Sequence, residues 1–250
     1  SGSVAARRGG ALGGRAEADV DTIFFDLDGT LYPNTSGFQA SQMNNLCEFV
    51  HLLGFPKGSD VGPVIHQLMG KYDESVIRAL RSAEAPWGVK TFDSEAMYQF
   101  VRKDCERLLQ ADPELERVMR LLPQRKFVFT NTHEASARHT LGVLGVDAGL
   151  FEGIIGAVAT DNIMKPSEKA FEAALRSAGR LDEPRRCVMF EDSPKNLVTA
   201  RRLGMRTVLV SNAGFDHVKE RGFDARIRRI SAATLRGACP WLEIAEATPD

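Results

Sequence analysis

The sequence has few of the residues from which zinc sites and disulfide frameworks are built. Only four of its 250 residues are cysteine, and these are scattered, with no Cys-x-x-Cys pair among them. The five histidines show no metal-binding spacing either. These absences argue against a structural zinc site and a disulfide-stapled fold, and they favour reduced thiols in an intracellular protein.

An excess of charge of either sign is also missing. Lysine and arginine total 32 residues against 33 aspartates and glutamates, which gives a net charge of -1 with histidine neutral. Such a chain has no overall basic field to hold a nucleic acid polymer or an anionic membrane. No apolar run approaches the length that spans a bilayer. We therefore expect neither nucleic acid nor membrane as a partner, and the oligomeric state stays open.

The first part of the chain, residues 1–19, differs from the rest in composition. It is rich in Gly, Ala and Arg and shows no apolar periodicity, so we predict a disordered leader. Its arginines stand among small residues, with no acidic residue before Glu17. This composition is compatible with a transit-peptide remnant and equally with a plain flexible leader. We expect a cytoplasmic protein, with a chloroplast or mitochondrial location as the alternative.

Five short apolar runs predict buried β-strands. The runs are continuous rather than alternating, which is typical of parallel strands covered on both faces. They occupy residues 22–25, 126–129, 154–158, 187–190 and 207–210. Helical periodicity over residues 134–144 and 167–178, and a helix start at Ser193, separate these runs. The alternation predicts an α/β core with a Rossmann-like, largely parallel sheet.

One segment breaks this alternation of strand and helix. Its apolar spacing predicts only helices, at residues 38–53, 64–69, 75–83, 94–109 and 113–122. A helical block is thus inserted directly after the first strand. We predict an α/β core of residues 20–34 and 113–250, with a helical cap of residues 35–112.

Polar residues follow the predicted strands at the points where the strands end. In an open parallel sheet, ligands bind at the carboxyl ends of the strands, so these side chains should meet at one edge. In chain order they are Asp26, Asp28, Thr130, Asn131, Lys165, Glu191 and Asp192. The sequence therefore places several carboxylates, a hydroxyl and an ammonium in one site.

This combination of side chains suits phosphoryl transfer. Asp26 would attack phosphorus and form an acyl-phosphate, and Asp28 would protonate the leaving oxygen and later activate water. Neighbouring carboxylates need a cation, and Mg²⁺ prefers oxygen ligands while it bridges to phosphate. We predict the side chains of Asp26 and Asp192 and the carbonyl of Asp28 as its ligands.

The remaining residues of the set would hold the phosphate or support the site. The metal and Lys165 would neutralise charge on the transferring group, and Thr130 and Asn131 would bind phosphate oxygens. Gly29 would let the chain turn sharply past the metal. Glu191 would orient Lys165 or a metal-bound water rather than bind the metal itself.

The sequence resembles the haloacid dehalogenase superfamily of phosphatases. The motifs that carry the resemblance are DLDGTL at 26–31, TN at 130–131, KP at 165–166 and EDS at 191–193, within a match over roughly residues 20–240. The resemblance implies Asp26 as nucleophile, Asp28 as general acid and base, and Thr130 and Lys165 as phosphate-binding residues. It also implies Asp192 as the direct metal ligand and a helical cap that closes over the site and selects the substrate.

A narrower resemblance is to the pyrimidine 5′-nucleotidase branch found in yeasts and plants. It is carried by DGTLYP at 28–33, FTN at 129–131, FEGII at 151–155, KPSEKAF at 165–171 and FEDS at 190–193. These stretches lie in the predicted core, whereas the cap decides the substrate. Plant members of this branch carry a His-Gly-Arg segment in the cap, where this chain has VRKDC at 101–105.

Other conspicuous side chains receive plainer interpretations. The basic cap residues are expected on a solvated helix face, His133 on a solvent-exposed helix, and Trp87 and Phe92 in the packing of the cap. The basic cap residues are Arg78, Arg81, Arg102 and Lys103.

The sequence as a whole predicts a magnesium-dependent phosphomonoesterase that acts on a small phosphorylated metabolite. Pyrimidine nucleoside monophosphates come first by resemblance, and phosphoglycolate, sugar phosphates and pyridoxal phosphate are alternatives. A phosphosugar mutase of the same superfamily and a non-catalytic regulatory or binding descendant also stay open. A dehalogenase is disfavoured, because the resemblance implies that those relatives lack the second acid, here Asp28.

Overall fold

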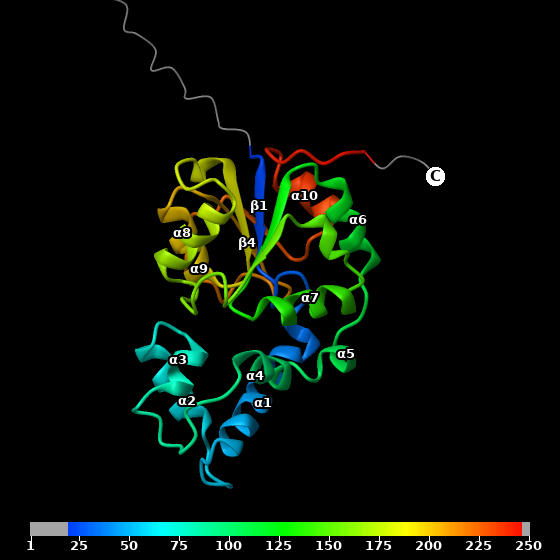
Figure 1. The fold of residues 1–250 in the computed structure, drawn as a ribbon. Helices are drawn as coiled ribbons and strands as arrows, with labels where there is room; N and C mark the ends of the chain where they lie inside the picture. The colour runs from blue at the N-terminus through cyan, green and yellow to red at the C-terminus, as the bar shows by residue number, and fades with distance from the viewer. Residues whose placement is uncertain (1–19, 247–250) are drawn as a thin grey trace, which may run out of the picture.

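A parallel six-stranded sheet forms the centre of the larger body of the molecule (Figure 1). The computed structural model describes residues 20–246, so the predicted leader, residues 1–19, lies outside the described residues. The strands are β1 Thr22–Phe25, β2 Arg125–Phe129, β3 Gly153–Ile155, β4 Cys187–Glu191, β5 Arg206–Val210 and β6 Ala225–Ile227. They run in the order β3-β2-β1-β4-β5-β6, and every pair is parallel. The predicted α/β fold with a Rossmann-like parallel sheet is confirmed.

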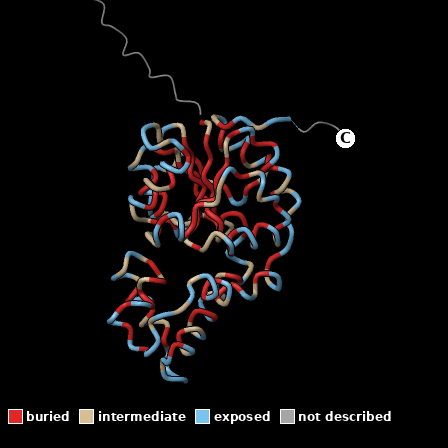
Figure 2. Tube along the Cα trace, in the orientation of Figure 1, coloured by how far each residue is buried: buried red, intermediate tan, exposed pale blue. Residues whose placement is uncertain are grey.

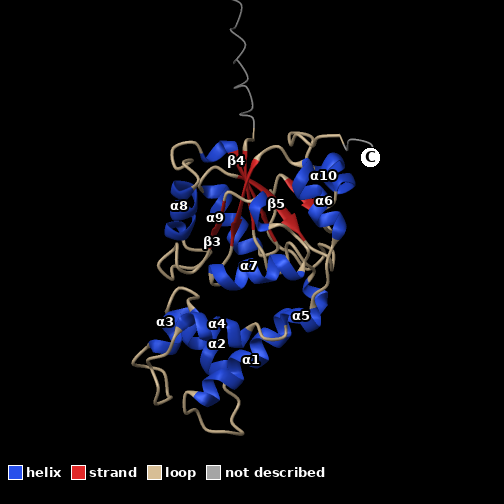
Figure 3. Ribbon diagram, turned by 45° about the vertical axis from the view of Figure 1, so that its right-hand side comes forward, coloured by secondary structure: helices blue, strands red, loops and turns tan. Residues whose placement is uncertain are grey.

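Helices cover both faces of this sheet (Figure 3). On one face lie α6 Pro113–Leu121, α7 Glu134–Val143 and α10 Ala232–Ala238, and on the other lie α8 Glu168–Ser177 and α9 Pro194–Arg202. Successive β1 residues alternate between the two faces, since Phe25 packs with the first group and Phe24 with the second. Figure 2 shows most strand residues buried, and every residue of β1 and β4 is buried, which explains why these two strands are largely apolar in sequence.

The strand predictions fail at two places. The run predicted at residues 154–158 forms a strand only as far as Ile155, because Gly156, Val158 and Ala159 donate their backbone N–H groups to the Glu134 carboxylate instead. β6 was not predicted at all. It is a three-residue edge strand with an arginine between two apolar residues, which is too short to give a periodic signal.

A smaller body of helices lies below the sheet in Figure 1. It is formed by α1 Phe38–Leu52, α2 Gly62–Lys71, α3 Val76–Arg81 and α4 Ser94–Val101, and the short α5 Cys105–Leu108 leads back to the core. The buried side chains of α1 to α4 form their own apolar cluster. Trp87 is 3% exposed and belongs to this cluster, and Phe92 packs against it, as predicted. The helical cap inserted after the first strand is therefore present.

The helix predicted over residues 94–109 is wrong, because the chain breaks between α4 and α5. Met97, Tyr98 and Val101 of α4 pack into the cap cluster, whereas Cys105 packs into the core. One straight helix cannot bury the same stripe in two separate bodies, so the chain turns at Arg102. None of the described helices has both the length and the apolar character needed to cross a membrane.

The burial of Phe171 allows a test of the packing of α8 on the sheet. Its side chain is fully buried, and its ring lies edge-on against Phe129 at 5.1 Å between centroids. We expect Phe171→Ala to lower the free energy of unfolding by roughly 3–5 kcal/mol, through lost burial and the cavity left behind. In the control Val198→Ala, where the valine is 45% exposed, the change should stay within about 0.5 kcal/mol. Urea unfolding of both variants measures the difference, and equal effects would contradict the described packing.

Candidate active site

The ammonium of Lys165 joins the carboxyl ends of three strands, β1, β2 and β4, at the edge of the sheet that faces the cap. Its Nζ donates to Asp26 Oδ1 at 2.7 Å, to Glu191 Oε2 at 2.7 Å and to the Phe129 carbonyl at 2.8 Å. Asp26 directly follows β1 and Glu191 ends β4, so adjacent parallel strands supply both acids. The three contacts use all three N–H bonds of the ammonium. These contacts leave no N–H bond of the Lys165 ammonium without an acceptor.

All three members of this cluster are buried. The exposed fraction is 6% for Asp26, 2% for Lys165 and 1% for Glu191. Burial alone would lower the pKa of Lys165, but the two carboxylates outweigh it and raise this pKa to about 12. Burial raises the pKa of Asp26 to about 7, with Glu191 and Asp28 adding to the effect and Lys165 opposing it. The site thus holds more negative charge than one lysine can balance.

The carboxylates of Asp26, Glu191 and Asp192 form a group that could hold a metal ion. One oxygen from each lies within 4.8 Å of the others. Glu191 is already engaged, because its Oε2 accepts from Lys165 and its Oε1 from the Ser193 N–H at 3.2 Å. Asp26 is engaged as well, because its Oδ1 accepts from Lys165 and its Oδ2 from the Thr30 hydroxyl at 3.1 Å, so hydrogen bonding does not single out two of the three carboxylates. The excess of buried carboxylate oxygens fits Mg²⁺, which prefers such ligands.

Gly29 leaves the space in which Asp192 sits. Its φ is +87°, and a Cβ atom there would lie 2.3 Å from Asp192 Oδ2 and 2.3 Å from Asn34 Oδ1. The Asn34 amide donates to Asp192 Oδ2 at 2.8 Å, so it orients this carboxylate. The sequence analysis missed Asn34, which nothing in the linear pattern separates from an ordinary turn residue.

Thr130 and Asn131 follow β2, but their side chains have different partners. The Thr130 hydroxyl accepts from the Thr132 N–H at 3.2 Å beside the Lys165 cluster. The Asn131 side chain instead binds the Lys165 backbone, with Nδ2 donating to its carbonyl at 3.1 Å and Oδ1 accepting from its N–H at 2.8 Å. Both ends of the amide are occupied. Asn131 therefore positions the Lys165 backbone, and this contact uses one of the two N–H bonds of its amide.

Asp28 pairs with Arg102, which follows the cap helix α4. Arg102 Nη1 donates to Asp28 Oδ1 at 2.8 Å and to Oδ2 at 3.1 Å. The Tyr32 hydroxyl also donates to Asp28, and Gln42 Nε2 lies 3.3 Å from its Oδ1. A carboxylate with this many donors is held in one orientation.

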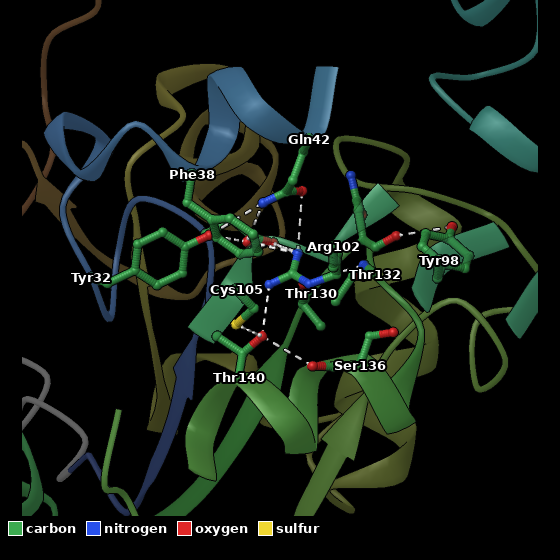
Figure 4. A network of polar contacts seen from close by, with 12 residues as sticks. Tyr32, Phe38, Gln42, Tyr98, Arg102, Cys105, Thr130, Thr132, Ser136 and Thr140 are labelled. Carbon is green, nitrogen blue, oxygen red and sulfur yellow. Dashed lines mark hydrogen bonds and ion pairs between the residues drawn. The ribbon is translucent and has the colours of Figure 1, made fainter. Parts of the chain in front are cut away.

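The predicted solvent exposure of Arg102 is wrong. The residue is 4% exposed, its Nη2 donates to Thr140 Oγ1 at 2.9 Å, and its guanidinium lies over the Phe38 ring at 4.9 Å (Figure 4). The helical spacing of the sequence did indicate that Arg102 is buried, because Arg102 lies on the same helix face as the buried residues Tyr98 and Val101. A charged residue on an apolar stripe indicates a buried partner.

The other basic cap residues remain outside the catalytic contacts. Lys103 pairs with Glu48 at 2.6 Å on the surface, Arg81 donates to the Phe92 carbonyl, and Arg78 donates to the Asp161 carbonyl. His133 differs from its prediction, because it is half-buried and caps α7. Its Nδ1 accepts from the Ala135 N–H at 3.2 Å. Ser193 stands at the start of α9 as predicted, but its side chain makes no capping hydrogen bond.

A cavity of about 270 Å³ lies between the core and the cap. Asp28, Asn131 and Thr132 line it from the core. Gln39, Gln42, Met43, Leu46, Val76, Met97, Tyr98, Val101 and Arg102 line it from the cap. The core side of the cavity is therefore polar, and the cap side is largely apolar.

The space at Gly29 predicts how a substitution there affects metal binding. Gly29→Ala would drive a methyl group into Asp192, so we expect Mg²⁺ affinity to fall by about 10–100-fold. Gly37→Ala is the matched control, because Gly37 also has a positive φ, of +80°, but nothing lies within 4 Å of its added Cβ. Calorimetric titration with Mg²⁺ measures both variants. A normal affinity in Gly29→Ala would contradict the role of this site in metal binding.

The raised pKa of Asp26 predicts a pH dependence of stability for the metal-free protein. The folded chain holds this proton more tightly than the unfolded chain, where the pKa is near its ordinary 3.8. Between about pH 4 and about pH 7 the folded state therefore binds more protons, and the free energy of unfolding falls as pH rises. Asp26→Asn should show a smaller fall over the same range. Thermal unfolding in chelator measures both proteins, and parallel pH profiles would contradict the raised pKa.

Comparison with known proteins agrees with this arrangement. Residues 20–204 match the haloacid dehalogenase-like hydrolase family. No curated protein gives a significant match. Among solved structures, CbbY from Rhodobacter sphaeroides in complex with phosphate is 23% identical, with a TM-score of 0.64 over 89% of this chain and 99% of that one.

Two further structures show the same fold at lower identity. The putative HAD-hydrolase YfnB from Bacillus subtilis is 18% identical, with a TM-score of 0.55 over 84% of this chain and 95% of that one. The L-2-haloacid dehalogenase RSc1362 is 16% identical, with a TM-score of 0.55 over 85% and 96%. These likenesses concern the fold, whereas the family match covers most of the chain. The protein belongs to the haloacid dehalogenase-like hydrolases.

Proposed function

We propose that the protein is a magnesium-dependent phosphomonoesterase that acts on a small phosphorylated metabolite through a phospho-aspartate intermediate. The observation that carries this proposal is the placement of two aspartates at the end of one strand. Asp26 is buried against Lys165, and Asp28, two residues on, faces the cleft. A fixed nucleophile beside a fixed acid and base is what two-step phosphoryl transfer requires.

In the first step, an Asp26 carboxylate oxygen attacks the phosphorus atom. The bond from phosphorus to the alcohol oxygen breaks, and Asp28 gives its proton to that oxygen so that the alcohol leaves neutral. Lys165 stabilises the charge on the phosphoryl oxygens, and the Thr130 hydroxyl and nearby backbone N–H groups hold them. Mg²⁺ on Asp26, Asp192 and the Asp28 carbonyl would neutralise further charge on the phosphoryl group.

In the second step, water attacks the phosphorus of the acyl-phosphate. Asp28 accepts a proton from this water, the bond between phosphorus and the Asp26 oxygen breaks, and inorganic phosphate leaves. Both aspartates then return to their starting states. The second acid also favours phosphate chemistry over dehalogenation, for which the protonation of a leaving alcohol is not needed.

The resemblance of the core motifs makes pyrimidine nucleoside monophosphates the first substrates to test. The cap segment at 101–105 lacks the His-Gly-Arg sequence of the plant enzymes in that branch. A panel should therefore include sugar phosphates, phosphoglycolate and pyridoxal phosphate beside the nucleotides.

Removal of the nucleophile tests the proposed chemistry. Asp26→Asn should lower magnesium-dependent phosphate release by at least about 10³-fold, because the amide cannot form the acyl-phosphate. Asp182→Asn, at an exposed position far along the chain, is the charge-matched control and should keep wild-type activity. Phosphate release with Mg²⁺ and with chelator measures all three proteins. If Asp26→Asn still released phosphate, the proposed mechanism would be wrong. If the wild-type protein released no phosphate, the proposed activity would be wrong.

A further inference from the structure

A single carboxylate holds the start of the loop of residues 156–164, which follows β3. Glu134 Oε1 accepts from the N–H groups of Gly156 at 2.9 Å and Ala159 at 2.8 Å. Its Oε2 accepts from the Val158 N–H at 3.2 Å. Gly156 permits this approach, because a Cβ atom there would lie 2.9 Å from Glu134 Cδ. Hydrogen bonds to an ionised carboxylate are stronger than those between neutral groups, so Glu134 fixes the course of the chain here.

The segment that carries Glu134 also holds the end of this loop. Asn131 binds the backbone of Lys165, which follows the loop directly. Between these two contacts, Asp161 and Asn162 have φ of +51° and +55°, a region that residues with a side chain seldom adopt. Such a backbone persists only where surrounding contacts support it. The loop therefore keeps its shape through the contacts at its two ends.

The cap packs on this loop. Ala157 and Met164, near the two ends of the loop, are 1% and 2% exposed and belong to the apolar cluster of the cap. Arg78 Nη2 of α3 donates to the Asp161 carbonyl at 3.1 Å. The same helix supplies Val76 to the cavity between core and cap. The position of this cavity wall therefore depends on where the loop lies.

We propose that Glu134 is a positioning residue that fixes residues 156–164 as the platform on which the cap docks. It acts through the loop, because its hydrogen bonds end on loop N–H groups and Arg78 of the cap binds a loop carbonyl. The effect of docking on turnover rests on the proposed phosphomonoesterase function. In that function, a cap docked on the platform closes the cavity over the leaving alcohol.

Reciprocal hydrogen exchange tests the coupling between Glu134 and the cap. In Glu134→Ala, the α3 amides should exchange at least about threefold faster, because the loop no longer presents its carbonyl to Arg78. In Arg78→Met, the amides of residues 156–164 should also exchange faster, since coupling between two sites is reciprocal. Mass spectrometry of peptides from the full chain measures both, with α8 as the internal reference. Faster exchange in only one of the two variants would overturn the inference.

Two controls match these variants. Arg81→Met removes the other arginine of α3, whose Nη2 donates to the Phe92 carbonyl within the cap. It should leave exchange in residues 156–164 unchanged, and a faster loop would show that the charge of α3 matters rather than the docking contact. Glu116→Ala removes a carboxylate of α6 that accepts the Asp147 N–H, outside the platform. It should leave exchange in α3 unchanged, and a faster α3 would contradict a specific role of Glu134.

The conservative variant Glu134→Gln separates positioning from general loosening of the fold. A glutamine oxygen in place of Oε1 keeps the bonds from Gly156 and Ala159, so most of the α3 protection should return. Exchange as fast as in Glu134→Ala would contradict the inference. If Glu134→Ala does not fold, Arg78→Met still decides, because it removes one contact between cap and loop and leaves the Glu134 contacts in place.

Turnover separates this inference from the proposed function. With para-nitrophenyl phosphate and Mg²⁺, Glu134→Ala and Arg78→Met should each lower kcat/KM by at least about threefold. The double variant should lose no more than the worse single variant, because both remove the same docking contact. Losses that multiply would mean that Glu134 acts independently of the cap. If the wild type releases no phosphate while the reciprocal exchange holds, the proposed function is wrong and the platform stands.

Discussion

The buried ammonium of Lys165 is the interaction on which the site depends. Asp26 and Glu191 would repel each other at the ends of neighbouring strands, and both are almost fully removed from water. A charge of opposite sign at 2.7 Å from each offsets part of this cost. Lys165 is held in turn by the Asn131 side chain, which binds its backbone on both sides. The order of the strands therefore matters chemically, because it brings the ends of three strands to one ammonium.

A second ion pair connects the cap to the chemistry. Arg102 turns inward where α4 ends, and it reaches the carboxylate that serves as acid and base in the proposed mechanism. The same guanidinium contacts Thr140 of α7 and the ring of Phe38 on α1, so it joins core and cap at one point. The orientation of Asp28 consequently depends on the position of the cap. One side chain of the cap thus fixes the residue that we propose as acid and base.

Most of the core could be predicted from sequence because burial on both faces leaves a continuous apolar run. β1, β2, β4 and β5 were predicted to within one residue at either end for this reason. β6 could not be predicted, since a short edge strand with one arginine gives no such run. Residues 94–109 were predicted as one helix, because apolar periodicity shows which helix face is buried. It does not show whether that face packs against the cap or against the core. Contacts between residues far apart in the sequence, such as Asn34 with Asp192, cannot be predicted from the local pattern of apolar and polar residues.

The same limit explains why the family could be assigned while the substrate could not. The core motifs lie at strand ends that the sheet brings together, and each motif is a short run that can be recognised in the sequence. The fold adds little beyond this, since a haloacid dehalogenase and CbbY both share it. What distinguishes one leaving group from another is the balance of charge and unpaired hydrogen-bonding groups at the cap. Here each buried cation in contact with the site already has a carboxylate partner, Lys165 with Asp26 and Glu191, and Arg102 with Asp28. A charged group that enters the cleft would therefore meet cations whose charge is already offset.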